Sequence, residues 1–512
     1  MKTTTLTLLL LLATPYSLLA TGASGAPASF PPPSPPGRGA RGEGAPQAHI
    51  AREYNLRVPA KLAHAAPVNL GNGARGFVFL FSAESNVDPF EGSFFFPKHP
   101  PFLAVFTEDG RELWRKELTH AIPGTWFIPV LPFDMDGDGV DEIYYVANQG
   151  PRPFDYKDYK LERLDARTGK LLASIDWPQP THNQANSYKW RFSLVGGHAR
   201  DGTPVLVAAV GTYRDMRLRA FNPSLKKRWE NYYPDDFNGP RGSHSTAILD
   251  LDNNRRGSGQ FLWGERCIDF DDGRERFVLD GATWYDHSDT VLPVYDPSTS
   301  RWLFWTTREK GDDGKLPRAV MFDHTGKPLW SIADMRGHYH YGWVGNFGPR
   351  GERIAMAGRY ASTSDKKKKT GAKNPLPANP YGIDAICHFY DAKTGRELPA
   401  PPFPSTGYPV DFNGDGVHEI YFDGALYDRL GRKILTAHAP DAEADFVIAK
   451  HILDLPGEHI MIATPDGKVR VWADRNAADT PAMKHRYTER IYTESVRHSA
   501  TGYNNRFPIL NY

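Results

Sequence analysis

The chain has 512 residues, of which 61 are Lys or Arg and 60 are Asp or Glu, so its formal net charge is +1. This balance gives no reason to expect nucleic-acid binding, which needs clustered positive charge. Only two cysteines occur, Cys267 and Cys387, and the sequence leaves open whether they form one disulfide or stay free thiols. A disulfide scaffold is excluded, so a chain of this length must be stabilised by its own core.

The first residues predict export. Lys2 precedes the apolar run Leu8–Leu12, and small residues recur between positions 20 and 26. This is the layout of a secretory signal peptide, and the apolar run is too short to cross a bilayer. We expect residues 1–26 to be a signal peptide and the protein to be secreted, extracellular or periplasmic, with no membrane partner.

A stretch rich in proline and glycine follows, PASFPPPSPPGRGARGEGAPQ, starting at Pro27. Such a composition cannot bury a core, and it predicts a disordered linker at residues 27–50. Residues 51–512 remain as the folded domain. Within them, the lysine run at Lys366–Thr370 lies in a segment rich in Gly, Pro and Asn, which predicts a solvated loop rather than a binding patch.

One short motif recurs through the whole folded part. A strand-like apolar run is followed by a turn rich in Asp, Asn, Thr and Gly and then by a second run, as in LAVFTEDGRELW and AVMFDHTGKPLW. This is the chemistry of β-hairpins, in which glycine supplies a positive φ. The turn glycine, replaced once by Leu225, marks hairpins at positions 110, 169, 225, 273, 326, 395, 431 and 467.

These hairpins recur at intervals of 36 to 69 residues, with almost no helical periodicity between them. One such unit is too small to bury both of its faces, so the units must stack in a ring. The sequence therefore predicts an all-β fold, a single β-propeller with eight blades, with seven blades as the alternative. We expect this propeller to be a monomer.

Two acidic loops, DMDGDGVDE at Asp134–Glu142 and DFNGDGVHE at Asp411–Glu419, share one pattern. Oxygens at positions one, three, five and nine, with the carbonyl of position seven, can surround one hard cation, so each loop predicts a structural calcium site. A metal-free Asp/Gly turn is the alternative. A third, decayed copy at Asp250–Ser258 is expected to be empty or weak. The expected ligands are Asp134, Asp136, Asp138, Glu142 and the Val140 carbonyl in the first loop, and Asp411, Asn413, Asp415, Glu419 and the Val417 carbonyl in the second.

The acidic loops run into strands, as GDGVDEIYY and GDGVHEIYF, and in this they resemble the FG-GAP repeat of propeller proteins. More narrowly, the chain resembles the rhamnogalacturonan lyases of polysaccharide lyase family eleven. The hairpins DARTGKLL and DHTGKPLW match the style of that family, and the C-terminal RYTERIYTESVRHSATGYNN is similar to its closing segment. The resemblance covers nearly the whole chain after the linker. It implies a secreted, calcium-binding, eight-bladed propeller that acts on a polysaccharide.

Several segments directly before the expected inner strands carry His, Arg or Lys. In RGHYHYGWV, Arg336–Val344, an extended chain would place His338 and His340 on one side and the two tyrosines on the other. If these segments occupy equivalent positions in their blades, the ring brings their side chains to one pore mouth. The expected group is His244, His287, His338, His340, Arg241, Arg336, Lys189 and Arg191.

That composition suits β-elimination on a uronic-acid polymer, and an acidic polysaccharide is the expected substrate. The reaction needs a cation beside the sugar carboxylate, a base for the neighbouring proton and an acid for the leaving oxygen. The predicted roles are His287 or His338 as base, Tyr341 or His244 as acid, Arg241 and Arg336 as carboxylate clamps, Lys189, Arg191 and His340 as further substrate contacts, and Trp284, Trp343 and Tyr341 as platforms for sugar rings.

Other functions remain open at this point. Three or four of the histidines could instead bind a divalent transition metal at the pore mouth, where Asp289 could join them. The chain could also be a non-catalytic, calcium-stabilised FG-GAP propeller that binds polysaccharide or protein. A quinone-dependent dehydrogenase is disfavoured because the chain lacks an adjacent cysteine pair, and a serine hydrolase because it lacks a G-x-S-x-G motif in the required setting.

Overall fold

The computed structural model describes most of the chain after residue 45. The described ranges are 46–84, 99–119, 125–152, 155–179, 191–234, 237, 239–252, 258–309, 315–334, 336–348, 351–360, 385–439 and 445–502. The predicted signal peptide, the predicted linker up to residue 45, Lys189 and the lysine run lie outside the described residues.

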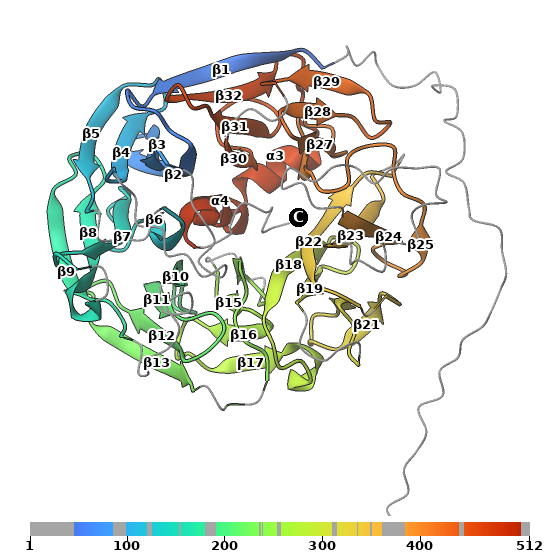
Figure 1. Ribbon diagram of the computed structural model, residues 1–512, viewed down its shortest axis with the longest axis horizontal. Coiled ribbons are helices and arrows are strands. Elements are labelled where there is room, and N and C mark those ends of the chain that lie inside the picture. Colours follow the sequence, from blue (N-terminus) through green and yellow to red (C-terminus); the bar gives the residue numbers. More distant parts are fainter. Residues whose placement is uncertain are drawn as a thin grey trace, which may run out of the picture.

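Eight antiparallel sheets of four strands surround one central axis, as Figure 1 shows. The predicted propeller is thus confirmed, with eight blades rather than seven. In the first seven blades the strands follow one another in chain order, from the innermost strand to the outermost. Each hydrophobic face is buried against the next blade, because a single sheet cannot cover both of its own faces.

The strands are short, as expected for blades. Blades one to four contain β2 (Leu62–Gly71), β3 (Ala74–Ser82), β4 (Phe102–Thr107), β5 (Glu112–Glu117); β6 (Val130–Phe133), β7 (Glu142–Asn148), β8 (Tyr159–Asp165), β9 (Leu171–Asp176); β10 (Phe192–His198), β11 (Pro204–Val210), β12 (Met216–Phe221), β13 (Lys227–Tyr233); and β14 (Thr246–Leu249), β15 (Gln260–Trp263), β16 (Arg266–Asp269), β17 (Glu275–Val278). Blades five to seven contain β18 (Ser288–Asp296), β19 (Arg301–Arg308), β20 (Ala319–Phe322), β21 (Pro328–Ser331); β22 (Tyr339–Asn346), β23 (Arg353–Tyr360), β24 (Ala385–Asp391), β25 (Glu397–Leu398); and β26 (Tyr408–Val410), β27 (Glu419–Phe422), β28 (Ala425–Tyr427), β29 (Lys433–Thr436). Short 3-10 helices are η2 (Thr125–Phe127), η3 (Tyr156–Asp158) and η4 (Leu279–Ala282).

The eighth blade closes the ring with strands from both ends of the chain. Its inner strands are β30 (Asp445–Lys450), β31 (His459–Ala463) and β32 (Lys468–Asp474), and its outermost strand is β1 (Ala48–Asn55). β1 pairs antiparallel with β32 along its whole length. The folded domain therefore begins before the predicted residue 51, since the last part of the predicted linker already belongs to β1.

The predicted hairpin turns join the third and fourth strands of the first seven blades. Their markers have positive φ, including +54° at Leu225, the one position without glycine. The eighth marker, Gly467, joins β31 to β32, because the fourth strand of that blade comes from the N-terminal side. The predicted number of hairpins is confirmed, but the last hairpin joins the second and third strands of its blade instead of the third and fourth.

Tryptophans at the ends of the hairpins link neighbouring blades. Trp114 on β5 donates from Nε1 to the carbonyl of Ala166, in the hairpin of the next blade, at 2.7 Å. Its ring covers Gly169 so closely that a Cβ there would lie 2.7 Å from the indole. Trp330 repeats the contact over Gly395, at 2.5 Å. Glycine is thus required twice at these turns, for its positive φ and for the close approach of the ring.

Two helices follow the last strand and lie toward the middle of the ring in Figure 1. They are α3 (Pro481–Thr488) and α4 (Arg490–Arg497), which η6 (His498–Ala500) continues. Thr480 caps α3 by accepting a hydrogen bond from the Met483 amide. Within the described residues, no helix is long and apolar enough to span a membrane. Both cysteines are free, which answers the question left open by the sequence.

Candidate active site

The segment before β14 runs beside the start of β18. Ser243 and Ser288 form an isolated parallel bridge, in which the Ser288 amide donates to the Gly242 carbonyl at 3.2 Å and the His244 amide donates to the Ser288 carbonyl at 3.3 Å. These backbone bonds connect the fourth blade to the fifth. They place the His244 side chain beside His287, with a distance of 5.1 Å between the ring centroids.

The sixth blade reaches the same place through a close approach of strands. A Cβ at Gly342, on β22, would lie 2.6 Å from Thr307 Cγ2 and 2.7 Å from Thr290 Oγ1, so glycine lets β22 pack directly on β18 and β19. The register of β22 shifts between Tyr339 and Tyr341. His340 lies at this irregularity, and its ring is 3.6 Å from that of His338. The predicted pairing of the two histidines on one side is confirmed.

Four histidines surround the carboxylate of Asp289. Oδ1 of Asp289 lies 3.2 Å from His244 Nδ1 and 3.7 Å from His287 Nε2. Oδ2 lies 2.7 Å from His340 Nδ1 and 3.7 Å from His338 Nε2. Asp289 is the second residue of β18, so the start of one inner strand organises residues from three blades.

Glu309 supplies a second carboxylate. It directly follows β19, whose end lies beside the start of β18 because the two strands are antiparallel. Its Oε2 contacts His287 Nε2, and its Oε1 contacts His338 Nε2. The ligand atoms of His244, His287, Asp289 and Glu309 lie within 4.8 Å of one another, and so do those of Asp289, His338 and His340. We call these six residues the histidine–carboxylate cluster.

A second layer of side chains holds the rings of this cluster. Asp286 Oδ1 lies 2.9 Å from His287 Nδ1, and the Tyr213 hydroxyl lies 2.7 Å from His244 Nε2. Tyr213 also meets His287 edge to face, with 4.4 Å between ring centroids. The guanidinium of Arg191, a buried residue, stacks over the Tyr213 ring at 5.2 Å.

Burial and mutual charge shift the pKa values of the cluster. Burial alone would raise the pKa of the Asp289 carboxyl, but the neighbouring imidazoles, first that of His244, hold it well below its usual range. Burial lowers the pKa of His338 to about 3. Burial also lowers the pKa of His244 well below its usual value. At neutral pH the cluster therefore presents an ionised Asp289 beside two neutral imidazoles.

The cluster is deeper on one side than on the other. The side chains of Asp289 and His287 are 3% and 7% exposed, whereas those of His338 and His340 are 27% and 21% exposed. A dissolved molecule can therefore reach the His338 and His340 side of the cluster, while the other side is closed by protein.

The structure brings together the four predicted histidines and places Arg191 in the second layer. Arg241 lies close behind, with its guanidinium 4.2 Å from the Phe237 ring and its amide bonded to the Asp286 carbonyl at 3.0 Å. Arg336 has a mostly exposed side chain that donates to Asp334 Oδ1 at 2.9 Å. This pairing does not favour Arg336 as the carboxylate clamp, and that role stays a prediction.

The predicted sugar platforms are wrong for both tryptophans. Trp284 is fully buried, with the guanidinium groups of Arg308 and Arg318 5.0 and 5.5 Å from its ring, and Trp343 is 1% exposed in an aromatic cluster of the core. No sugar ring can stack on a face that protein already covers. Tyr341 packs against the same core as Trp343, which does not favour it as the acid.

Sequence reasoning missed Glu309, Tyr213 and Asp286. Glu309 and Tyr213 follow second strands, β19 and β11, whose ends lie at the same end of the blades as the starts of the inner strands. This placement could have been used to predict them. The second strand of a blade ends beside the start of the first strand, so a polar residue just after it lies near the segment that precedes the first strand. Asp286 was directly next to a predicted histidine.

The first acidic loop already contains a positive charge. The amides of Gly137 and Gly139 donate to Asp134 at 2.8 and 3.0 Å, which gives the compact turn expected of such a loop. However, Arg163 from β8 donates to Asp136 Oδ2 at 2.8 Å and also contacts Glu142. Two of the five expected calcium ligands are thus neutralised by a guanidinium.

The second acidic loop fits a cation better. Asp411 and Glu419 are both buried, and burial raises the pKa of each carboxyl well above its usual value. Asp411 Oδ2 accepts from the Gly416 amide at 3.1 Å, while its buried Oδ1 has no hydrogen-bond partner among the described residues. Leu426 stands opposite Tyr421 where the first loop has Arg163 opposite Tyr144. The charge of Arg486 lowers the pKa of Asp411 but does not outweigh its burial, so a calcium ion would supply the positive charge that no cross-strand arginine supplies here.

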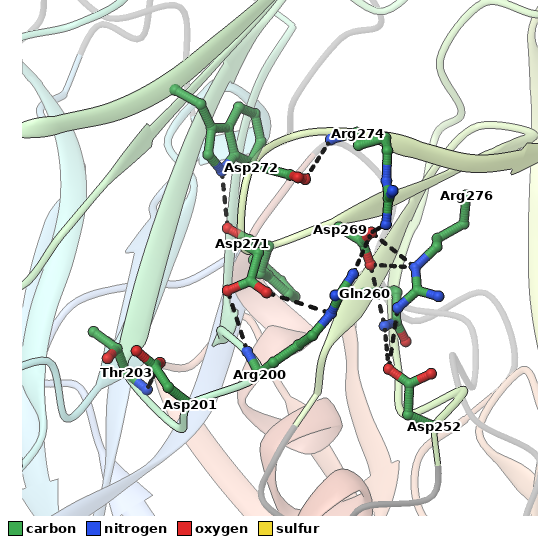
Figure 2. Close-up of polar contacts among 12 residues, drawn as sticks. Arg200, Asp201, Thr203, Asp252, Gln260, Asp269, Asp271, Asp272, Arg274 and Arg276 are labelled. Atoms are coloured by element: carbon green, nitrogen blue, oxygen red, sulfur yellow. Dashed lines mark hydrogen bonds and ion pairs between the residues drawn. The ribbon is translucent and has the colours of Figure 1, made fainter.

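The decayed third loop also carries an arginine. Figure 2 shows Arg276 between two acidic side chains, bonded to both oxygens of Asp269 at 2.7 Å and to Asp252 at 3.1 Å. Gln260 stands where the other loops have glutamate, and it accepts from the Leu251 amide at 3.0 Å. Arg276 thus places a positive charge beside these acidic side chains, and the expectation that the third copy is empty or weak stays a prediction, since residues 253–257 lie outside the described residues.

No protein-family model matches the chain, and no curated protein matches its sequence. Solved structures do match. The exotype rhamnogalacturonan lyase YesX shares 17% identity at a TM-score of 0.68, over 90% of this chain and 79% of that chain. The rhamnogalacturonan lyase PL11 of Bacillus licheniformis shares 18% at 0.67, over 88% and 80%. The rhamnogalacturonan lyase YesW shares 17% at 0.67, over 90% and 80%. At this identity the likeness is one of fold, and it is the fold that the sequence motifs predicted.

Proposed function

We propose that this protein is a secreted polysaccharide lyase that cleaves a uronic-acid-containing polysaccharide, rhamnogalacturonan or a similar polymer, by β-elimination. The fold that it shares with rhamnogalacturonan lyases supports the class of enzyme. The observation that carries the proposal is the gathering of four histidines and two carboxylates from three blades around Asp289.

The exposed side of the histidine–carboxylate cluster is the proposed place of reaction. β-elimination needs a positive group beside the uronate carboxylate and groups that move a proton at the adjacent carbon and the leaving oxygen. Of the two predicted bases, His338 is open to solvent and His287 is not. Tyr213, which is partly exposed and contacts His244, replaces Tyr341 as the tyrosine of the site. We assign proton transfer to His338 and Tyr213.

The test is an assay on a panel of uronic-acid polysaccharides, followed by the ultraviolet absorbance of the unsaturated product that elimination leaves. We expect product from at least one polymer, and His338→Ala should lower its rate by about 100-fold or more, the usual size of a proton-transfer contribution. The matched control is His49→Ala, on outermost strand β1, which should leave the rate unchanged.

The unfolding temperature of His338→Ala must stay close to that of the parent, so that a lower rate reflects the lost side chain and not an unfolded protein. A folded protein that gives no unsaturated product on the whole panel would contradict the lyase. Retained binding to a polymer without cleavage would instead support the non-catalytic propeller, the alternative function.

We further infer that the second acidic loop holds a structural calcium ion. The ligands would be Asp411, Asn413, Asp415 and Glu419 with the Val417 carbonyl. The buried, unpartnered Asp411 oxygen supports this assignment. In the first loop, with Asp134, Asp136, Asp138, Glu142 and the Val140 carbonyl, oxygens of the three aspartates lie within 4.8 Å of one another. A calcium ion there would compete with Arg163 for Asp136 and Glu142, so we infer that this is the weaker site.

A further inference from the structure

The oxygens of Asp289 divide the histidine–carboxylate cluster into two halves. Oδ1 faces Nδ1 of His244 and Nε2 of His287, at 3.2 and 3.7 Å. Oδ2 faces Nδ1 of His340 and Nε2 of His338, at 2.7 and 3.7 Å. A carboxylate that only anchored one histidine would not need a pair of imidazole nitrogens at each of its oxygens.

Glu309 repeats this division. Its Oε2 contacts His287, in the first half, and its Oε1 contacts His338, in the second half. The first half therefore has two imidazole nitrogens and one oxygen from each of two carboxylates, all within 4.8 Å of one another. The second half has two imidazole nitrogens and one Asp289 oxygen within that distance, and a Glu309 oxygen that contacts His338. This is the ligand pattern of sites with two metal ions, in which carboxylates bridge ions that lie a few ångströms apart.

The second layer orients the imidazoles of the first half for this purpose. Asp286 is 2.9 Å from Nδ1 of His287, where its carboxylate accepts a hydrogen bond. This leaves Nε2 of His287 directed at Glu309 and Asp289. Tyr213 holds Nε2 of His244 at 2.7 Å and leaves Nδ1 directed at Asp289. A histidine held by an oxygen atom at one nitrogen and offering the other to a metal is the common arrangement in metalloproteins.

We propose that the histidine–carboxylate cluster binds two divalent transition-metal ions bridged by Asp289 and Glu309. His244 and His287 complete the set around the first ion, and His338 and His340 complete the set around the second. Imidazole with carboxylate suits zinc, manganese or iron rather than calcium, which prefers oxygen ligands alone. The proposal concerns ligand geometry and holds whether or not the protein is a lyase.

The two halves differ in access. The first half is closed by protein, as in metal sites that have a structural role, whereas His338 and His340 are 27% and 21% exposed. The second ion would keep a position open to a ligand from solution. If the proposed lyase function is right, that ligand is the uronate carboxylate. With the ion bound, His338 is a metal ligand, and the proton transfer assigned to it above passes to Tyr213. His338→Ala then lowers the cleavage rate through loss of the ion.

The test counts metal ions and does not need a substrate. The full-length protein is loaded with zinc or, separately, with manganese, freed of loosely bound ions and measured by elemental mass spectrometry. We expect two ions per chain. His340→Ala, on the exposed half, should retain one ion, and Asp289→Asn, which removes one of the two bridging carboxylates, should bind fewer ions than the parent.

Two controls make the count interpretable. Asp411→Asn changes the proposed calcium loop and should leave two zinc or manganese ions in place. Manganese-loaded protein should show the magnetic coupling between neighbouring ions in its paramagnetic resonance spectrum. The decisive variant is His340→Ala, because its side chain is partly exposed and its circular dichroism should match that of the parent, whereas Asp289 is buried.

A parent protein that binds one ion or none at saturating metal would overturn the proposal. So would two manganese ions without coupling, or a folded His340→Ala that still binds two. The metal count and the polysaccharide assay can fail independently. A lyase that does not bind two metal ions gives unsaturated product but fewer than two ions per chain. A two-metal protein that is no lyase gives the full count and no product.

Discussion

Gly342 controls how closely the fifth and sixth blades approach at the candidate site. A Cβ there would meet Thr307 and Thr290 at 2.6 and 2.7 Å, closer than real Cβ contacts allow. We expect Gly342→Ala to displace β22 and so move His338 and His340 away from Asp289. The expected result is a loss of about 10-fold or more in cleavage rate, since small misplacements of reacting groups are costly.

The matched control for this change is Gly259→Ala, because nothing lies within 4 Å of a Cβ at that position. The unfolding temperature should fall by a few degrees in Gly342→Ala and stay unchanged in Gly259→Ala. If Gly342→Ala kept its full cleavage rate and metal content, the close approach would not determine the geometry of the site.

At the scale of residues, the sequence predicted those parts of the site that share one strand. Period-two alternation predicted that His338 and His340 lie together, and their rings do, although the register shift at His340 interrupts the regular alternation. Glu309 could not be found in this way, because it meets His338 only through the pairing of β19 with β18 and the packing of β22 on both. The buried Trp284 shows the opposite error, since composition alone cannot tell a sugar platform from a buried aromatic ring that contacts two arginines.

At the scale of elements, the three acidic loops share one hydrogen bond from a backbone amide to a side chain. The side chain that opens the following strand accepts from the amide of the second loop residue, at 3.0 Å for Glu142, 2.9 Å for Glu419 and 3.0 Å for Gln260. The loops therefore have the same local form but different sources of positive charge. Arg163 and Arg276 come from later strands of the same blades, β8 and β17, which is why the loop sequences alone did not reveal them.

This difference predicts how calcium stabilises the protein. Adding calcium should raise the unfolding temperature by several degrees, and Asp411→Asn should abolish most of that rise, because a bound ion stabilises the folded state alone. Asp134→Asn in the first loop is the matched control and should leave the rise largely intact. Scanning calorimetry with calcium and with a chelator measures both; equal losses in the two variants would contradict the assignment.

Glu494 connects α4 to the third and fourth blades. Its Oε1 lies 3.2 Å from His198 Nδ1 and 2.7 Å from Arg490 Nε, and its Oε2 accepts from Ser258 Oγ at 3.2 Å. Burial would raise the pKa of Glu494, but the contacts with His198 and Arg490 outweigh it and lower the pKa to about 2. A folded-state pKa below the unfolded one stabilises the fold at high pH, and the contribution fades as pH falls.

We therefore expect Glu494→Gln to lose about 3 kcal/mol of unfolding free energy at neutral pH, the order that such a shift implies. The gap between variant and parent should narrow as pH falls from the ordinary glutamate value of 4.5 toward 2. Urea unfolding across that range is the measurement, with Glu397→Gln, at a mostly exposed glutamate, as the control. A gap that stayed constant with pH would show that the charge of Glu494 is not what matters.

At the scale of the whole molecule, the blade number was predictable because each hairpin is local and carries its own turn chemistry. The exact start of the domain was not, since β1 lies in residues whose composition continues that of the linker and is defined only by pairing with β32. The helices in the middle of the ring were also missed. α3 and α4 follow the last repeat and are stabilised by contacts such as Tyr492 with Glu458, which no local pattern encodes.

The closure of the ring also imposes an order on synthesis. His49 bonds to a residue 424 positions further along the chain, so a ribosome must make nearly the whole protein before β1 can find its neighbour. Until then the seven complete sheets would form an open arc with both end faces bare, and bare β surfaces tend to stick to other chains. The nascent protein should therefore depend on chaperones most strongly just before its last strands are synthesised.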